Sequence, residues 1–344
     1  MSGEIYGIGV GTGDQVALTD IRKICINIVL FLSVLCTFLL LGYPFFKFIV
    51  YAGDKKVRNK RKWFGLKHAQ INHPRNGYED KYEEGRAWCQ LSYESGVMKD
   101  RYIISDDGLR LHACYLPADK PKRILLLSHG YRGSGFGDFA NMARFLHENG
   151  CDLLFIDQRC CGLSEGKYIT FGAREHRDIL KWVRQLDENN KNDLPIYLYG
   201  ESMGAATILM ASGHELPGNV KGLICDCGFC SMKQQLRDIA KEWFHIKWIE
   251  LLLLRVDLFC RLFAGFKMSD ADTKEALSKC RIPILFFHGS DDTYVKAHNS
   301  VKNYEMCRSG KDLMIVRGAR HMCSPYVEEK EYRGRITEFF KAND

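Results

Sequence analysis

The feature that most constrains this chain is the pentapeptide Gly-Glu-Ser-Met-Gly at residues 200–204, which has the pattern G-x-S-x-G. It follows a short apolar, β-prone run at 195–199 and precedes a good helix start at 205–210. A strand, a tight turn with two glycines and a helix form the context in which this pattern makes a nucleophile elbow. The turn forces the serine backbone into a strained conformation, so the neighbouring side chains must be small. We therefore expect Ser202 to lie at the carboxyl end of a strand, where a base can reach it.

The chain also carries an acid and a histidine that would complete a catalytic group with Ser202. A buried-type strand leads into a turn with two carboxylates, Asp291 and Asp292. We assign Asp292 as the acid that orients a histidine and stabilises its imidazolium form, because Asp291 is better placed to cap the turn or the following helix. Two histidines follow Asp292. His298 lies in a helix-like stretch too close in sequence to Asp292 to reach over Ser202, and His321 lies in a loop after another apolar run. His321 is the predicted general base.

Backbone N–H groups that would stabilise an oxyanion are predicted at two places. One belongs to Met203, the residue after the predicted nucleophile, and the other to Tyr131, in the loop after the first core strand. His129 lies in the same loop and could be mistaken for a base. Its position directly at the strand end favours a structural role in packing that loop.

From residue 101 to residue 341 the chain resembles the α/β-hydrolase superfamily, whose catalytic residues follow in the order Ser, acid, His. It is most similar to membrane-tethered, largely uncharacterised bacterial hydrolases that are often grouped with the serine aminopeptidase (S33)-like branch. Further matching segments are 157–166, which resembles D-x-R-G-x-G-x-S-x-G, and 226–229. Cys160 replaces the first glycine of that motif, so its turn is not expected to use a glycine-only conformation there. Met322 stands where relatives commonly have glycine.

The resemblance and the alternation of short apolar strands with helices imply an α/β-hydrolase fold. We expect a mostly parallel, eight-stranded sheet flanked by helices, with a helical cap and an N-terminal transmembrane helix. Strands are predicted at 102–104, 110–115, 124–128, 153–156, 196–199, 222–225, 284–287 and 313–316. Helices are predicted at 82–93, 139–148, 174–187, 205–212, 295–307 and 328–341.

The 344 residues, 46% of them hydrophobic, are enough to bury one large catalytic core with an N-terminal extension. The predicted organisation is an N-terminal tail at 1–23, a transmembrane anchor at 24–50, a basic linker and leading helix at 51–97, and the hydrolase domain at 98–344. The cap is expected at about 231–279, where the strand–helix alternation is interrupted.

The predicted anchor rests on the stretch from 24 to 46, which contains no charged residue and could cross a hydrocarbon core of about 30 Å as a helix. A cleaved signal peptide is the alternative, but the run exceeds the usual signal core and no A-x-A-like site follows it. The cations at Lys47 and 55–62 outnumber Arg22 and Lys23 on the other side. The positive-inside rule therefore predicts a single-pass membrane protein with its catalytic domain in the cytoplasm.

Two further observations bear on this placement. The 14 cysteines fit a reducing compartment better than a disulfide-stabilised one. The basic run at 55–62 could rest on anionic lipid head groups, as an alternative to a solvated linker.

The cap segment has its own apolar pattern. Stretch 248–263 is apolar nearly all round, and one face of a preceding helix is predicted from residues at i, i+3, i+4, i+7 and i+8, namely Leu236, Ile239, Ala240, Trp243 and Phe244. The cap is expected to pack over the sheet edge. Two additional roles stay open: a lid that lines an apolar acyl pocket, or a contact with the bilayer.

Several kinds of partner are not expected. The formal charge of +7 is modest and no basic stripe interleaved with aromatic residues suggests nucleic-acid binding. Cys225, Cys227 and Cys230 have metal-like spacing but lack a second pair at a matching distance, so no zinc site is predicted. The chemistry requires no cofactor and no metal, and no oligomeric state is predicted.

The predicted function is that of a serine hydrolase that cleaves a carboxylic ester or thioester through an acyl-enzyme on Ser202. The apolar cap favours a small-molecule substrate with an acyl chain. A peptidase of the aminopeptidase type is the alternative, on the resemblance. A non-catalytic ligand-binding protein of the same fold is a third possibility, disfavoured because such a protein is expected to lose a catalytic residue or an elbow glycine.

Overall fold

The computed structural model describes residues 21–33, 42–53, 77–245 and 249–344. Its centre is one sheet of eight strands in the order β1-β2-β4-β3-β5-β6-β7-β8. β2 pairs antiparallel with β1 and with β4, and all other neighbours are parallel. The expected mostly parallel, eight-stranded α/β-hydrolase sheet is therefore confirmed. The strands are β1 (Lys99–Ile104), β2 (Arg110–Leu116), β3 (Arg123–Ser128), β4 (Cys151–Ile156), β5 (Ile196–Glu201), β6 (Val220–Asp226), β7 (Ile284–Gly289) and β8 (Lys311–Val316).

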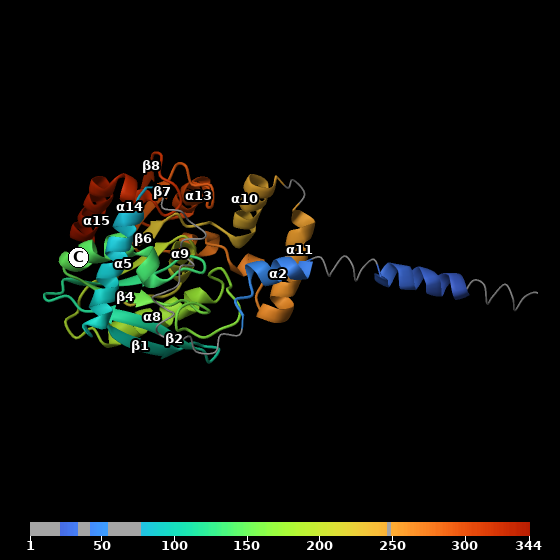
Figure 1. The fold of residues 1–344 in the computed structure, drawn as a ribbon, viewed down its shortest axis with the longest axis horizontal. Helices are drawn as coiled ribbons and strands as arrows, with labels where there is room; N and C mark the ends of the chain where they lie inside the picture. The colour runs from blue at the N-terminus through green and yellow to red at the C-terminus, as the bar shows by residue number, and fades with distance from the viewer. Residues whose placement is uncertain (1–20, 34–41, 54–76, 246–248) are drawn as a thin grey trace, which may run out of the picture.

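Helices cover both faces of this sheet (Figure 1). Those outside the cap are α2 (Gly42–Ile49), α5 (Glu79–Glu94), α6 (Gly135–Asp138), α7 (Ala140–Glu148), α8 (Glu175–Glu188), α9 (Met203–Ala211), α12 (Lys274–Lys279), α13 (His298–Met306), α14 (Ser324–Val327) and α15 (Glu329–Asn343). Every residue of β3, β4, β5 and β7 is buried. Strands covered on both faces need apolar side chains on both, which is why these runs are apolar rather than alternating.

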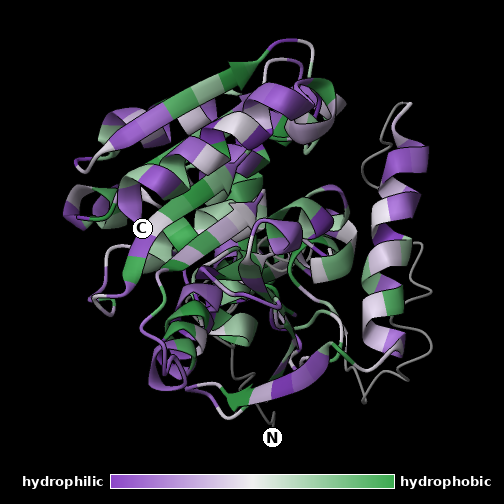
Figure 2. Cartoon of the chain, turned by 90° about the vertical axis from the view of Figure 1, so that its left-hand side faces the viewer, coloured by the Kyte–Doolittle hydropathy of each residue, from purple (hydrophilic) through white to green (hydrophobic). Residues whose placement is uncertain are grey.

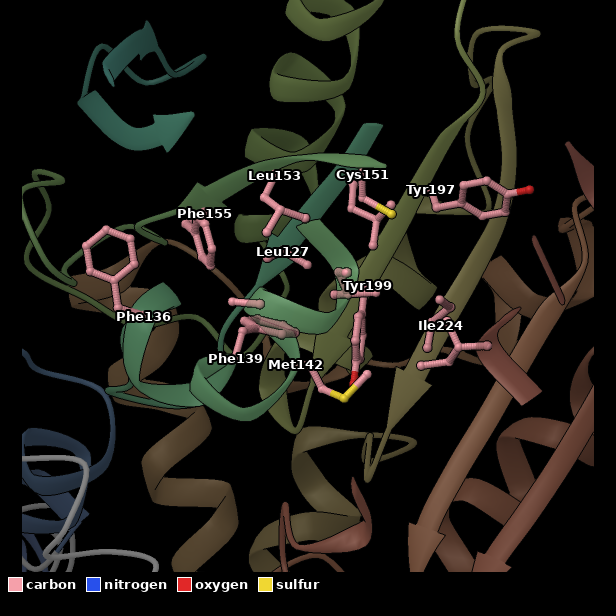
Figure 3. Packing of buried hydrophobic residues seen from close by; sticks show 14 of the residues in the cluster. Leu127, Phe136, Phe139, Met142, Cys151, Leu153, Phe155, Tyr197, Tyr199 and Ile224 are labelled. Carbon is pink, nitrogen blue, oxygen red and sulfur yellow. The ribbon is translucent and has the colours of Figure 1, made fainter. Parts of the chain in front are cut away.

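Successive side chains of a strand point to opposite faces of the sheet and belong to two separate buried clusters. Leu127, Leu153, Phe155 and Tyr199 pack with Phe139 under α5, α6, α7 and α15, and Figure 3 shows this side of the sheet. The other cluster packs neighbouring strand residues against α8, α9 and α12. Figure 2 shows the hydrophobic interior strands beside helices of mixed hydropathy. Apolar burial on both faces is the main stabilising contribution and holds the strand ends in fixed positions.

The predicted helical cap is present between β6 and β7. It consists of α10 (Met232–Phe244), α11 (Glu250–Phe259), a π-helical turn η1 (Cys260–Ala264) and a short 3₁₀ turn η2 (Met268–Asp270). Two details differ from expectation. α12 belongs to the main core, because Leu277 is buried beside the sheet. The apolar face predicted for α10 is only partly buried, because Trp243 and Phe244 are exposed at its C-terminal end.

The N-terminal segment differs more strongly from the predicted anchor. Among the described residues, no helix is both long and apolar enough to span a membrane. Residues 21–33 form a helix with exposed side chains, and part of the predicted 24–50 anchor, residues 34–41, lies outside the described residues. The end of that segment is a short helix, α2, whose Phe46 and the following Val50 are buried in one apolar cluster with the cap. Phe46 and Val50 therefore pack against protein, whereas Tyr43, Phe45 and Phe48 of the same segment stay exposed. Parts of the predicted tail and basic linker, 1–20 and 54–76, also lie outside the described residues.

Candidate active site

Ser202 lies in the turn between β5 and α9 with a backbone conformation that few side chains adopt. Its φ is 54° and its ψ is −120°. The two glycines of the pentapeptide are needed for steric reasons. A Cβ on Gly204 would lie 1.8 Å from the carbonyl oxygen of Ser128, and a Cβ on Gly200 would lie 2.5 Å from the backbone of Gly204. The Ser202 N–H donates to the carbonyl of Asp226 at 2.9 Å, which ties the turn to the neighbouring strand.

The three residues predicted to act with one another lie together. His321 Nε2 is 2.9 Å from Ser202 Oγ, and His321 Nδ1 is 2.6 Å from Asp292 Oδ2. The three come from the loops after β5, β7 and β8, all at the carboxyl end of the parallel strands. Because both ring nitrogens are engaged, the chemically consistent arrangement has Nδ1–H donating to the carboxylate and Nε2 accepting the serine O–H. Ser202 is 3% exposed and His321 5% exposed, so this pair is shielded from bulk water.

Asp292 is held as a charged acceptor. Its Oδ1 accepts the N–H groups of Tyr294 at 2.9 Å and Val295 at 2.8 Å. Burial acts to raise the pKa of Asp292, but electrostatic attraction to His321 and hydrogen bonds from His288 and His321 outweigh it and hold that pKa below its ordinary value.

The turn contacts at Asp292 correct one expectation. We expected Asp291 to cap this turn, whereas Asp292 does so and the exposed Asp291 accepts only from Ser290 within the turn, at 2.7 Å. The same contacts explain why α13 begins at His298 rather than at 295: the preceding residues form this turn.

The loop predicted to supply an oxyanion donor lies directly against the serine. A Cβ on Gly130 would be 3.2 Å from the Ser202 Cβ, and the Gly130 N–H donates to Asp138 at 2.7 Å, which fixes the loop. The N–H groups of Tyr131 and Met203 donate to no acceptor within the described part of the chain. Two unengaged N–H groups beside the serine are available to a developing oxyanion.

The same loop holds the N-terminal segment, a link that the sequence did not predict. The Tyr131 hydroxyl donates to the carbonyl of Ile49 at 2.6 Å. Arg132 donates to the carbonyls of Phe48 at 2.9 Å and Tyr51 at 3.2 Å. These contacts were not predicted, because the predicted transmembrane anchor placed residues 42–50 in the lipid.

The surroundings of the serine are apolar. Met203, Phe171 and Phe229 belong to the buried cluster that also contains residues of α2, α10 and α11, with Tyr131 and Tyr294 packed on it. Burial raises the pKa of Tyr131 to about 12, so its hydroxyl is neutral. A surface cavity of about 460 Å³ elsewhere is lined by Arg159 and Arg174 and by none of the three central residues. Met203, next to the buried Ser202, thus packs in one apolar cluster with residues of the cap and α2.

The two other histidines weighed as bases lie outside this group. His129 is fully buried, with Nδ1 2.7 Å from the Gly130 carbonyl and Nε2 accepting the Gln158 N–H at 3.0 Å. These contacts support its structural role. His298 is paired with Asp238 at 3.1 Å.

Two residues near the centre were not assigned a role from the sequence. His288 Nε2 is 3.4 Å from Asp292 Oδ2, and it donates to the Val295 carbonyl at 2.8 Å. The position of His288, four residues before Asp292 at the end of β7, is the sequence signal that could have identified it as a neighbour of the acid. Cys227 is the other: its sulfur, a carboxylate oxygen of Asp292 and a ring nitrogen of His321 lie within 4.8 Å of one another. Burial raises the pKa of Cys227 well above its ordinary value, so it is a neutral thiol.

A second group with potential metal ligands lies at the sheet edge. Its atoms belong to Asp100, His112 and Cys114 and lie within 4.8 Å of one another. His112 Nδ1 is 2.7 Å from Asp157, and its Nε2 is 3.1 Å from Asp100. Burial acts to lower the pKa of His112, but the two carboxylates outweigh it and raise that pKa. Both ring nitrogens of His112 therefore already have carboxylate partners within this group.

The two departures from the family motifs keep the backbone shape that glycine favours. Cys160 has φ 67° and Met322 has φ 57°. We expected the turn at Cys160 to avoid this conformation, and that expectation is wrong. Both side chains are buried, so packing holds the two residues in a conformation that non-glycine residues rarely adopt.

The chain is similar in sequence to two families of hydrolases. Residues 119–259 match the family described as serine aminopeptidase, S33, and residues 253–323 match the family described as serine hydrolase (FSH1). The uncharacterized protein YqkD of Bacillus subtilis is 29% identical over 223 residues, which cover 65% of this chain and 72% of that protein. Monoglyceride lipase of Mus musculus is 25% identical over 257 residues, which cover 64% and 82%.

Solved structures with the same fold include an esterase of Pyrococcus furiosus. It matches with a TM-score of 0.58 and 21% identity, over 72% of this chain and 91% of the esterase. At this identity the likeness shows the fold. The sequence matches and the fold agree with the resemblance noted for residues 101–341.

Proposed function

Because this chain belongs to the α/β-hydrolase superfamily and is a serine hydrolase of its S33-like branch, we propose that it cleaves a carboxylic ester or thioester through an acyl-enzyme on Ser202. The observation that carries the proposal is the pair of hydrogen bonds from one histidine: His321 contacts Ser202 at 2.9 Å and Asp292 at 2.6 Å. This is the arrangement in which a base activates a serine and an acid orients the base.

In this mechanism His321 Nε2 takes the proton from Ser202 as its oxygen attacks the substrate carbonyl. Asp292 keeps the Nδ1–H tautomer in place and stabilises the imidazolium that forms. The N–H groups of Tyr131 and Met203 stabilise the oxyanion of the tetrahedral intermediate. The shielded, apolar surroundings strengthen these charge interactions, because little water competes with them.

The intermediate then collapses. The bond to the leaving alcohol or thiol breaks as His321 returns the proton to it, leaving the acyl group on Ser202. Water, deprotonated by His321, attacks the acyl-enzyme and releases the carboxylic acid. Nothing in this cycle requires a metal or an organic cofactor.

An acyl ester or thioester is preferred over a peptide because of the apolar cluster around Ser202. Met203, Phe171 and Phe229 offer an apolar surface to an acyl chain. Monoglyceride lipase, one of the relatives, is by its name an enzyme that acts on such a substrate. Cleavage of peptides is the second candidate, favoured by the S33 serine aminopeptidase match at residues 119–259.

A substrate panel tests this preference. Full-length protein in mild detergent is assayed with p-nitrophenyl esters of short and long acids, acyl-CoA thioesters and aminoacyl p-nitroanilides. We expect turnover of esters or thioesters that falls by roughly 10³-fold or more in Ser202→Ala. His298→Ala is the matched control, since its exposed imidazole does not touch the centre, and it should retain activity. Anilide cleavage without ester or thioester cleavage would support the peptidase instead.

A further inference from the structure

We propose that the outer face of α2, α11 and η1 docks on the surface of an anionic lipid bilayer. We define this α2–α11 face by its exposed apolar side chains: Phe45, Phe48, Leu251, Leu254, Leu262 and Phe263. Figure 1 shows α2 and α11 at the end of the molecule opposite α15. The binding is interfacial, with apolar side chains entering the head-group and acyl boundary rather than a helix crossing the bilayer.

The first support is an apolar stripe along α11 and η1 that no segment within the described residues covers. Leu251, Leu254, Leu258 and Leu262 follow i, i+3, i+7 and i+11 spacing, which places them on one side of a helix. The opposite side of the same helix is buried through Leu253 and Val256. A helix that is apolar on both its packed side and its solvent-facing side exposes a second apolar surface, which is typical of a site for a partner or a membrane.

The second support is that α2 extends this stripe as part of the same rigid face. Phe46 contacts the rings of Phe259 and Phe263 at centroid distances of 6.0 and 5.9 Å. A Cβ on Gly42 would lie 2.5 Å from the Arg255 Cβ, so α2 approaches α11 closely. Phe45 and Phe48 then point away from this packed contact and are exposed.

Charge favours a lipid surface as the occupant. The two acids of α11 are neutralised by neighbours: Glu250 accepts from Arg237 at 2.6 Å, and Asp257 from Arg261 at 2.8 Å. Lys47 is exposed on α2 itself. Six lysines and arginines follow within the sequence 55–62. An exposed apolar face on a chain whose sequence continues into a basic run matches the acyl boundary and anionic head groups of a bilayer.

Chain continuity supports the same occupant. The helix at 21–33 leads towards α2 along the chain and exposes Ile24, Val29, Phe31 and other apolar side chains. Its apolar surface, like that of α2, has no cover in the described part of the chain. An interfacial bilayer contact would cover exposed apolar side chains of both kinds.

The face adjoins the serine loop. Tyr131 and Arg132 hold the carbonyls of Ile49 and Phe48 at the end of α2. Docking would therefore bring the covered centre next to the lipid phase, where acyl substrates partition. This consequence rests on the proposed function, but the docking itself does not, and it is measured with a protein that cannot turn over.

The test is sedimentation of full-length Ser202→Ala protein with vesicles of phosphatidylcholine, alone or mixed with phosphatidylglycerol. The double variant Leu254→Asp, Leu262→Asp removes the centre of the face. We expect its affinity for the mixed vesicles to fall roughly tenfold or more, because two leucines no longer enter the boundary. Leu91→Asp on α5 is the matched control: Leu91 is 64% exposed and Leu254 is 63% exposed. It should bind like the parent, and the parent should bind phosphatidylcholine alone more weakly.

Hydrogen exchange gives a second readout that does not depend on total affinity. Mixed vesicles should slow exchange in α2 and α11 and leave α5 unchanged. Equal binding of the double variant and the parent, or unchanged exchange in α11, would overturn the proposal. So would equal binding to both kinds of vesicle. Light scattering without lipid that shows a dimer, lost in the double variant, would identify a second copy of the chain as the occupant and overturn it as well.

Discussion

At the scale of single residues, the turn that holds Ser202 depends on a few positions where a larger side chain would clash with the backbone. Ser202 has a positive φ, and the glycines on either side of it face backbone atoms rather than movable side chains. Backbone atoms at a strand end cannot shift without breaking the sheet ladder. The G-x-S-x-G pattern is thus a steric requirement of this turn, as well as a sequence signature.

Gly204→Ala tests that requirement. Its new methyl group would lie 1.8 Å from the Ser128 carbonyl oxygen, so we expect a loss of about 3 kcal/mol in the free energy of unfolding. Urea unfolding measures the change. Gly334→Ala is the control, since a Cβ there meets no atom within 4 Å. Equal stability of the two variants would show that the elbow is not sterically confined.

The lowered pKa of Asp292 predicts how its contribution to stability depends on pH. Because the folded pKa lies below the unfolded value near ~4, the contribution is fully present above that value and is lost as pH falls through the folded pKa. The stability difference between the native chain and Asp292→Asn should therefore shrink as the pH falls below about 4. Urea unfolding at several pH values measures this difference.

The neighbouring acid provides the control for that experiment. Asp291 is exposed and accepts only from Ser290, so Asp291→Asn should change stability little at any pH. A stability difference for Asp292→Asn that grows as the solution is acidified would contradict a lowered pKa for the Asp292 carboxyl.

At the scale of elements, the positions of the strands were predictable, and the cap and the N-terminal segment were only partly so. All eight strands were expected, because central parallel strands are short apolar runs between turns. Ser202, Asp292 and His321 were expected together because each follows such a strand. The packing of residues 42–50 against the cap was not predicted, because hydropathy does not distinguish a lipid-facing segment from one packed on a cap. The exposed end of α10 escaped prediction for the same reason: periodicity predicts a face but not its cover.

The packing of α2 can be tested with two phenylalanines of the same helix. Phe46 is 2% exposed and Phe48 is 76% exposed. In the absence of lipid, Phe46→Ala should remove about 3 kcal/mol of packing between α2 and α11 and speed hydrogen exchange in both. Phe48→Ala should leave exchange unchanged. Similar exchange in the two variants would contradict the packed position of α2.

At the scale of the whole molecule, the candidate site lies at the carboxyl ends of the parallel strands. The loops after β3, β5, β7 and β8 meet at the carboxyl end of the strands, and two buried clusters hold those strands in register. The cap and α2 then cover that end with a third, apolar cluster. The positions of Ser202, Asp292 and His321 therefore depend on the large core, whereas access to Ser202 depends on the smaller cluster above it. This division predicts that variants of the cap alter substrate access and size preference before they alter the chemistry.

In the mechanism that we propose, Ser202 is an activated nucleophile. Labelling by a fluorophosphonate probe measures this directly, because the probe reacts with activated serines and does not need the natural substrate. We predict that the native full-length chain is labelled, that Ser202→Ala abolishes labelling, and that His321→Ala reduces it sharply. Correctly folded native protein that takes up no probe, or labelling that persists in Ser202→Ala, would contradict this role of Ser202.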